Sequence, residues 1–173
     1  MRRAAFLDRD GTLIHDPGHL GDPEGVILLA GAAQAVAMLR QAGYVIVVVT
    51  NQSGVARGYY DEAAVHAVNR RMRELFLRED AQAVIDAIYH CPHGPDGGCD
   101  CRKPRPGMFL RAALELDLAL AHSLCIGDAP SDCAAARAAG VGETRQLGAA
   151  PLPPSLLVAT RQLLFGSEIL EIA

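Results

Sequence analysis

The sequence predicts an α/β protein: a three-layer sandwich with a mainly parallel sheet and a zinc-binding loop. Apolar runs of strand length alternate with helical patterns, as in successive βαβ units. Half of the residues are apolar but only 5% are aromatic, which suits helices layered on a sheet. Because 173 residues is the length of one domain, we expect a single domain over residues 1–173.

Five strands are expected from short apolar runs bounded by turn residues. The run from Tyr44 to Thr50 is continuous and rich in β-branched residues, which is typical of a strand covered on both faces. The expected strands are residues 4–8, 44–50, 83–89, 123–127 and 141–147.

Five helices are expected between and after these strands. Gly43 is a stop signal for the first helix, and Asp61 and Ser131 are candidate N-caps of the second and fourth. Pro106 can open the third helix. The expected helices are residues 31–42, a helix after Asp61, a helix from Pro106 through Leu116, a short helix from Ser131 to Gly140, and a last helix after Pro153-Pro154 to Leu164.

Charge and hydropathy exclude several classes of partner. The net charge is -4 and no run of Lys or Arg exceeds a pair, which argues against nucleic acid and membrane surfaces. The apolar runs fall short of the ~20 residues that a membrane span needs. The apolar stretch after Met1 is too short for a signal peptide. We therefore expect a cytoplasmic protein, and a monomer.

Two carboxylates directly follow the first apolar run, in Asp8-Arg9-Asp10-Gly11-Thr12. A buried parallel strand would deliver both to a crevice at its carboxyl end. Carboxylates that converge hold a cation or share a proton. Asp8 is therefore the expected nucleophile of phosphoryl transfer through an aspartyl-phosphate, with Asp10 as acid and base. The alternative is a turn in which the acids only cap a helix.

A polar turn follows the second strand. Thr50, Asn51, Gln52 and Ser53 combine hydroxyl groups with successive backbone N–H groups, which suits phosphate oxygens. An ordinary turn would use the same residue types.

Lys103 is the only lysine beside fifteen arginines, which indicates that a compact ammonium is needed there. It could offset phosphoryl charge beside Asp8, while Arg102 could grip a substrate hydroxyl or second phosphate. A solvated basic pair is the alternative. Asp128, at the end of the fourth strand, is the expected third carboxylate of a Mg²⁺ site. Asp132 is expected to orient that site or a helix start.

The loop after the third strand holds three cysteines and a histidine: Cys91, His93, Cys99 and Cys101. This donor set matches a closed, tetrahedral, structural zinc site. Five cysteines in a cytoplasmic chain do not predict a disulfide framework, and Cys125 and Cys133 are expected in the core. The remaining histidines, among them His66 and His90, have no partner pattern and receive no role.

Four segments, DRDGT, VVVTNQSGVARG, CPHGPDGGCDCRKPRPG and CIGDAPSD, together resemble the haloacid dehalogenase superfamily of phosphatases. The resemblance spans about residues 4–142 and is greatest to the branch that acts on heptose bisphosphate and histidinol phosphate. The resemblance implies a Rossmann-like fold with minimal or no cap domain. It also implies a Mg²⁺-dependent phosphomonoesterase that removes the 7-phosphate of a heptose bisphosphate, a small phosphorylated sugar. This reaction would serve nucleotide-activated heptose synthesis for lipopolysaccharide or surface glycan.

The resemblance also implies individual roles. Mg²⁺ would bind Asp8, the backbone carbonyl of Asp10, and Asp128, and the loop after the first motif would contact substrate through Asp16 and His19. Two positions depart from the pattern: Ala129 stands where Lys is common, and His19 where Tyr is common.

Three alternatives remain. The first is a phosphatase for histidinol phosphate or another small sugar phosphate. The second is a receiver module that keeps a long-lived phospho-Asp, and the third is a zinc-loop interaction protein without activity.

Overall fold

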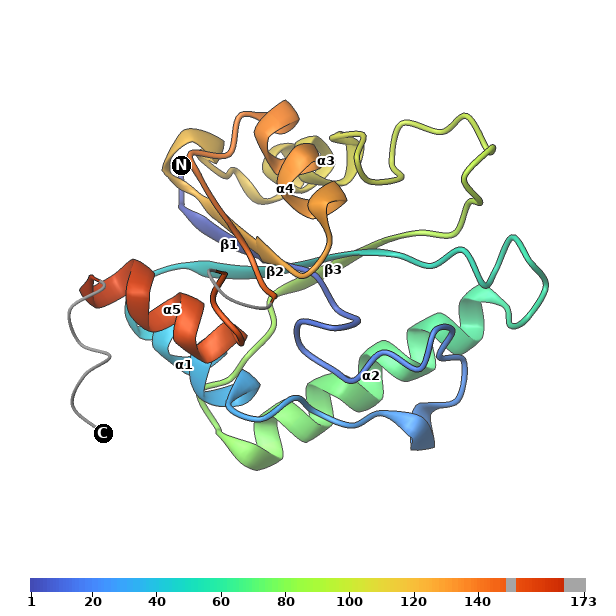
Figure 1. Ribbon diagram of the computed structural model, residues 1–173, viewed down its shortest axis with the longest axis horizontal. Helices are drawn as coiled ribbons and strands as arrows, with labels where there is room; N and C mark the ends of the chain where they lie inside the picture. Colours follow the sequence, from blue (N-terminus) through green and yellow to red (C-terminus); the bar gives the residue numbers. More distant parts are fainter. Residues whose placement is uncertain (149–151, 167–173) are drawn as a thin grey trace.

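The computed structural model describes residues 1–148 and 152–166, which form one five-stranded sheet with helices on both faces (Figure 1). All neighbouring strands are parallel, in the order β3-β2-β1-β4-β5. The strands are β1 (Ala4–Leu7), β2 (Val45–Asn51), β3 (Ala87–Cys91), β4 (Leu124–Gly127) and β5 (Glu143–Gln146). The helices are α1 (Ala32–Gln41), α2 (Glu62–Glu79), α3 (Gly107–Leu116), α4 (Pro130–Ala139) and α5 (Leu156–Phe165), with short 3-10 turns η1 (Pro23–Gly25) and η2 (Leu120–His122). The predicted fold class is confirmed.

The sheet separates two hydrophobic clusters, as expected when both faces are covered. Helices α1, α2 and α5 lie on one face and α3 and α4 on the other (Figure 1). Side chains alternate along β2, so Val48 packs under α1 and α2 while Val47 and Val49 pack under α3. The central strand β1 is buried along its whole length.

Most predicted boundaries agree with the structure. The Asp61 carboxylate accepts a hydrogen bond from Ala64 N at 2.9 Å and caps α2. Gly43 follows α1 with a φ of 87°, a conformation that favours glycine. Gly140 ends α4 in the same region, with a φ of 88°.

Two boundary predictions are wrong. β3 begins at Ala87 rather than at residue 83. The Asp86 carboxylate accepts the hydrogen bond of Ile46 N at 2.8 Å, so the preceding residues pack in the core without joining the ladder. Helix α4 begins at Pro130, and Ser131 is not its cap. Instead the Asp132 side chain accepts from Ala129 N at 3.0 Å.

The connections at the carboxyl edge of the sheet determine what covers it. The segment between β1 and α1 contains only η1, and the segment between β3 and α3 contains no helix or strand.

Across residues 1–148 and 152–166, no helix combines the length and apolar character needed to cross a membrane. The predicted domain, 1–173, includes residues 149–151 and 167–173, which lie outside the described residues.

Candidate active site

A pocket of about 200 Å³ lies at the carboxyl ends of β1, β2 and β4. This is the edge at which open α/β sheets bind ligands. Of the residues predicted for the reaction and its substrate, all but Arg102 line it. They are Asp8, Asp10, Asp16, His19, Thr50, Asn51, Gln52, Ser53, Lys103 and Asp128. Segments from four parts of the chain therefore meet here, as the sequence predicted.

Lys103 lies at the base of the pocket, with its side chain only 2% exposed. Its ammonium donates to Asp8 Oδ1 at 2.7 Å and to Val49 O at 2.8 Å, and it pairs with Asp132 Oδ1 at 2.6 Å. Burial raises the pKa of Asp8 to about 7, although the charge of Lys103 opposes this shift. The two carboxylates raise the pKa of Lys103 against the effect of its burial, so the lysine stays charged.

Asn51 holds the backbone of Lys103 in place. Its amide nitrogen donates to Lys103 O at 3.1 Å, and its oxygen accepts from Lys103 N at 3.0 Å. The end of β2 thus fixes the position of a residue about fifty positions later in the chain. Both polar atoms of the Asn51 side chain are engaged in this contact, and the prediction that the turn residues contact phosphate concerned hydroxyl and backbone N–H groups.

Asp10 is held by a partly buried hydrogen-bond network that the sequence did not reveal. Arg9 is fully buried, pairs with the Asp10 carboxylate at 3.1 Å, and donates to Asn69 Oδ1 at 2.9 Å. Gln52 Nε2 donates to Asp10 Oδ2 at 2.8 Å, and Tyr60 OH donates to Gln52 Oε1 at 3.0 Å. These contacts limit the orientations that the Asp10 carboxylate can adopt.

Replacing Gln52 with Ala is expected to lower kcat about 10- to 100-fold with little change in KM, because a misoriented acid or base slows proton transfer. Steady-state kinetics measures both constants. Gln41→Ala is the matched control, since the Gln41 side chain is exposed and donates to Gln82 at the surface. An unchanged kcat in Gln52→Ala would show that Gln52 does not position Asp10.

Three carboxylates converge beside Lys103. Asp8, Asp128 and Asp132 each offer an oxygen within 4.8 Å of the others. Gly11 makes room for them, because a Cβ on it would lie 2.3 Å from Asp128 Oδ2. Oxygen donors of this kind suit a hard divalent cation. As expected, Asp132 orients the group: one oxygen holds Lys103 and the other accepts from Ala129 N.

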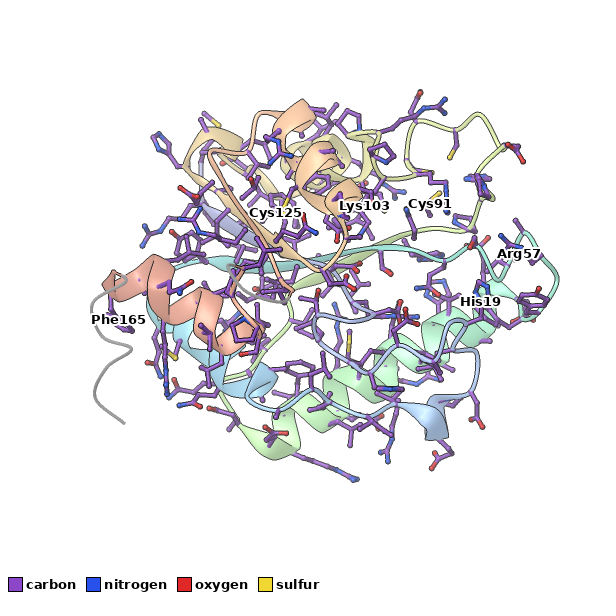
Figure 2. All side chains as sticks on the ribbon, viewed as in Figure 1. His19, Arg57, Cys91, Lys103, Cys125 and Phe165 are labelled. Atoms are coloured by element: carbon purple, nitrogen blue, oxygen red, sulfur yellow. The ribbon has the colours of Figure 1, made fainter. Side chains whose placement is uncertain are left out.

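The predicted zinc ligands also come together. Cys91, His93, Cys99 and Cys101 each offer a ligand atom within 4.8 Å of the others. The Cys91 and Cys99 sulfurs are 3.6 Å apart, and His93 Nδ1 is 3.5 Å from Cys91 Sγ. No disulfide forms among the cysteines, and Cys125 and Cys133 are buried as predicted. In the view of Figure 2, Lys103 lies between Cys125 and Cys91.

Replacing one ligand of the Cys/His cluster is expected to destabilise the protein. Cys99→Ser should lose about one equivalent of bound zinc and lower the thermal unfolding midpoint, because metal binding contributes directly to folding. Metal analysis and thermal denaturation measure the two effects. Cys133→Ser changes a buried cysteine outside the cluster and should retain the metal. Equal metal content in Cys99→Ser and the wild type would exclude Cys99 as a ligand.

Arg102 lies outside the pocket, in an adjoining hollow that shares Asn51, Lys103 and Ser131 with it. Its guanidinium donates to His93 O at 3.1 Å. The site also contains residues that the sequence analysis did not assign: Arg9, Tyr60 and Asn69. Of these only Arg9 carried a signal, namely its place between the two acids.

The fold and this site are those of a hydrolase, and comparison with known protein families agrees. A model of haloacid dehalogenase-like hydrolases matches residues 18–140. The chain therefore belongs to the haloacid dehalogenase-like hydrolases.

Within this family, the chain is similar to curated relatives of one named activity. The chain is 42% identical over 146 residues to the D-glycero-beta-D-manno-heptose-1,7-bisphosphate 7-phosphatase of Haemophilus ducreyi, covering 81% of this chain and 80% of that relative. It is 37% identical over 180 aligned positions to the Pseudomonas aeruginosa enzyme of the same name, covering 98% and 99%. The crystal structure of the D,D-heptose 1,7-bisphosphate phosphatase from B. bronchiseptica, complexed with magnesium and phosphate, has a TM-score of 0.83 and 37% identity, covering 94% and 98%.

Proposed function

We propose that this protein is a phosphatase that removes the 7-phosphate of D-glycero-beta-D-manno-heptose 1,7-bisphosphate. The reaction class rests on one observation: Asp8 lies in a pocket beside a buried ammonium and a second and third carboxylate. The substrate rests on the curated relatives, which carry this name over four-fifths or more of the chain. The step would serve nucleotide-activated heptose synthesis for lipopolysaccharide or surface glycan.

In the first half of the proposed reaction, an Asp8 oxygen attacks phosphorus. A carboxylate oxygen to phosphorus bond forms as the bond from phosphorus to the sugar oxygen breaks, and the Asp10 carboxyl gives its proton to that oxygen. In the second half, the Asp10 carboxylate takes a proton from the attacking water. The water oxygen then bonds phosphorus as the bond from phosphorus to the Asp8 oxygen breaks, which releases phosphate and restores the Asp8 carboxylate.

The remaining polar groups hold the phosphoryl oxygens. Lys103 places a positive charge 2.7 Å from the nucleophile, where negative charge accumulates during transfer. Thr50 and Ser53 line the same pocket and can donate hydroxyl hydrogen bonds. Preorganised donors of this kind stabilise the transition state more than the bound substrate.

The carboxylates fit Mg²⁺, with Asp8 and Asp128 as side-chain ligands and the Asp10 carbonyl as the expected backbone ligand. When bound, the ion would neutralise phosphoryl charge and orient the group for in-line attack. The Cys/His cluster fits zinc, because thiolate and imidazole are the donors that structural zinc sites use.

Mg²⁺ affinity is expected to fall as the pH is lowered below about 7. Because burial raises the pKa of Asp8 to about 7, its carboxyl is protonated below that value and must lose a proton to bind the ion. The expected loss is about tenfold per pH unit. Calorimetric titration of the phosphate-free protein at pH 6 and 8 measures it. Equal Mg²⁺ affinity at the two pH values would contradict the raised pKa of Asp8.

The rest of the substrate would lie outside the pocket, whose volume of about 200 Å³ is below the 300–1,000 Å³ of drug-sized ligand sites. Asp16 and His19 line the pocket, and the His19 ring packs against the Tyr59 ring in a tilted arrangement with centroids 5.0 Å apart. Arg102, in the adjoining hollow, is the proposed contact for a distal hydroxyl or phosphate. Ala129 lines the main pocket, where it leaves out the ammonium that a Lys at this position would supply.

The substrate is tested by phosphate release from heptose 1,7-bisphosphate with Mg²⁺, followed by phosphorus NMR. We expect loss of the 7-phosphate signal and retention of the 1-phosphate signal. Histidinol phosphate is the comparison substrate. Faster turnover of histidinol phosphate would overturn the heptose assignment while leaving the reaction class. A stable phospho-Asp8 without turnover would overturn the reaction class.

A monomeric state and a cytoplasmic location complete the proposal, and size-exclusion chromatography tests the monomeric state.

A further inference from the structure

The first turns of α2 and the end of β3 bring together two histidines to which the sequence pattern gave no role. Glu62 and His66 are four residues apart on α2, so they share one face of the helix. His90 is the last but one residue of β3. Its Nε2 lies 3.0 Å from Glu62 Oε2, and the ring centroids of His66 and His90 are 5.2 Å apart.

The three side chains form a donor set for a metal ion. Each offers one ligand atom within 4.8 Å of the others, before any ion has drawn them together. Ligands about 2.0–2.2 Å from one shared ion lie about 3–4 Å apart, which is within reach of small side-chain rotations. Glu62 and His66 are exposed and His90 is partly exposed, so an ion can enter from solvent.

This cluster is separate from the Cys/His cluster although His90 precedes Cys91. Side chains alternate along a strand, so His90 faces α2 while Cys91 packs in the core under α3. Both clusters border one hollow along the edge strand β3. The hollow also contains Arg111, whose charge is compensated by Glu115 at 2.8 Å.

We propose that Glu62, His66 and His90 form a second metal site, which takes a divalent transition metal such as Zn²⁺ or Ni²⁺ and leaves coordination positions open to water. Two imidazoles and one carboxylate select transition metals over Mg²⁺, which prefers oxygen donors. The ion would link the start of α2 to the end of β3. Since α2 follows the segment that carries Gln52 and Tyr60, this link would brace one wall of the active site.

The test is calorimetric titration with Ni²⁺ of protein that holds one equivalent of zinc, enough for the Cys/His cluster alone, in saturating Mg²⁺, which occupies the oxygen site. The wild type should bind one equivalent of Ni²⁺ without releasing zinc. His66→Ala should weaken binding at least tenfold, since even an indirect ligand contact contributes about 10- to 100-fold to metal affinity. His66→Ala is informative because it leaves the contact between His90 and Glu62 intact.

His122→Ala, at an exposed histidine on η2, is the matched control and should bind Ni²⁺ like the wild type. Paramagnetic broadening of the imidazole signals of His66 and His90 should accompany binding and should be absent for His122. Ni²⁺ binding of equal affinity in the wild type and His66→Ala would overturn the proposal. So would an absence of binding to the wild type, which would leave His90 and Glu62 as an ordinary hydrogen-bonded pair.

Discussion

Asp8→Asn is expected to abolish phosphate release, with a loss in kcat of at least about 10⁴-fold, because removal of a nucleophile that forms a covalent intermediate eliminates the step itself. The amide is nearly isosteric with the carboxylate, but it is a poor nucleophile. Phosphate release under saturating substrate and Mg²⁺ measures the effect. No aspartyl-phosphate should be trapped in the variant.

The fold of Asp8→Asn should remain intact. Burial disfavours the ionised form of Asp8, as its raised pKa shows, so a neutral amide should not lower the stability of the metal-free protein at pH 8. Asp117→Asn is the matched control, because Asp117 is exposed near the N-terminus, on the opposite edge of the sheet. Residual activity within tenfold of the wild type would exclude Asp8 as the nucleophile.

Lys103→Met should cause the second large effect, a loss of both activity and stability. Met has a similar length but no charge, so it leaves Asp8 and Asp132 buried without their shared cation. Breaking a buried ion pair by removing one partner costs about 3–5 kcal/mol. Urea denaturation measures the free energy of unfolding, and phosphate release measures kcat.

A second substitution separates the two effects. Adding Asp132→Asn to Lys103→Met removes one of the two unpaired charges, so it should recover part of the stability but none of the activity. Arg105→Met is the control for removal of an exposed cation in the same segment. Activity of Lys103→Met near that of the control would show that the ammonium plays no part in phosphoryl transfer.

The order of elements and most of the pocket could be predicted because both follow from local patterns. Parallel strands end at a common edge, so residues placed just after a strand, such as Asp8, Thr50 and Asp128, must lie near one another. The four zinc-ligand candidates could be predicted from residue type, because few other arrangements satisfy three thiols and an imidazole in one short loop. The start of β3 could not, because a side chain from Asp86 replaces a backbone acceptor.

The sequence by itself determined the fold class, the acids at the strand ends, and the importance of the lone lysine. Only the tertiary structure decided what these groups contact. In the structure the Asn51 amide bonds to the backbone of Lys103, and Arg9 is buried against Asp10. Arg102 lies in a separate hollow, and the rings of His66 and His90 pack together. The physical reason is that strand position follows from local hydrophobic pattern, whereas a side chain's partners depend on which distant segments pack beside it.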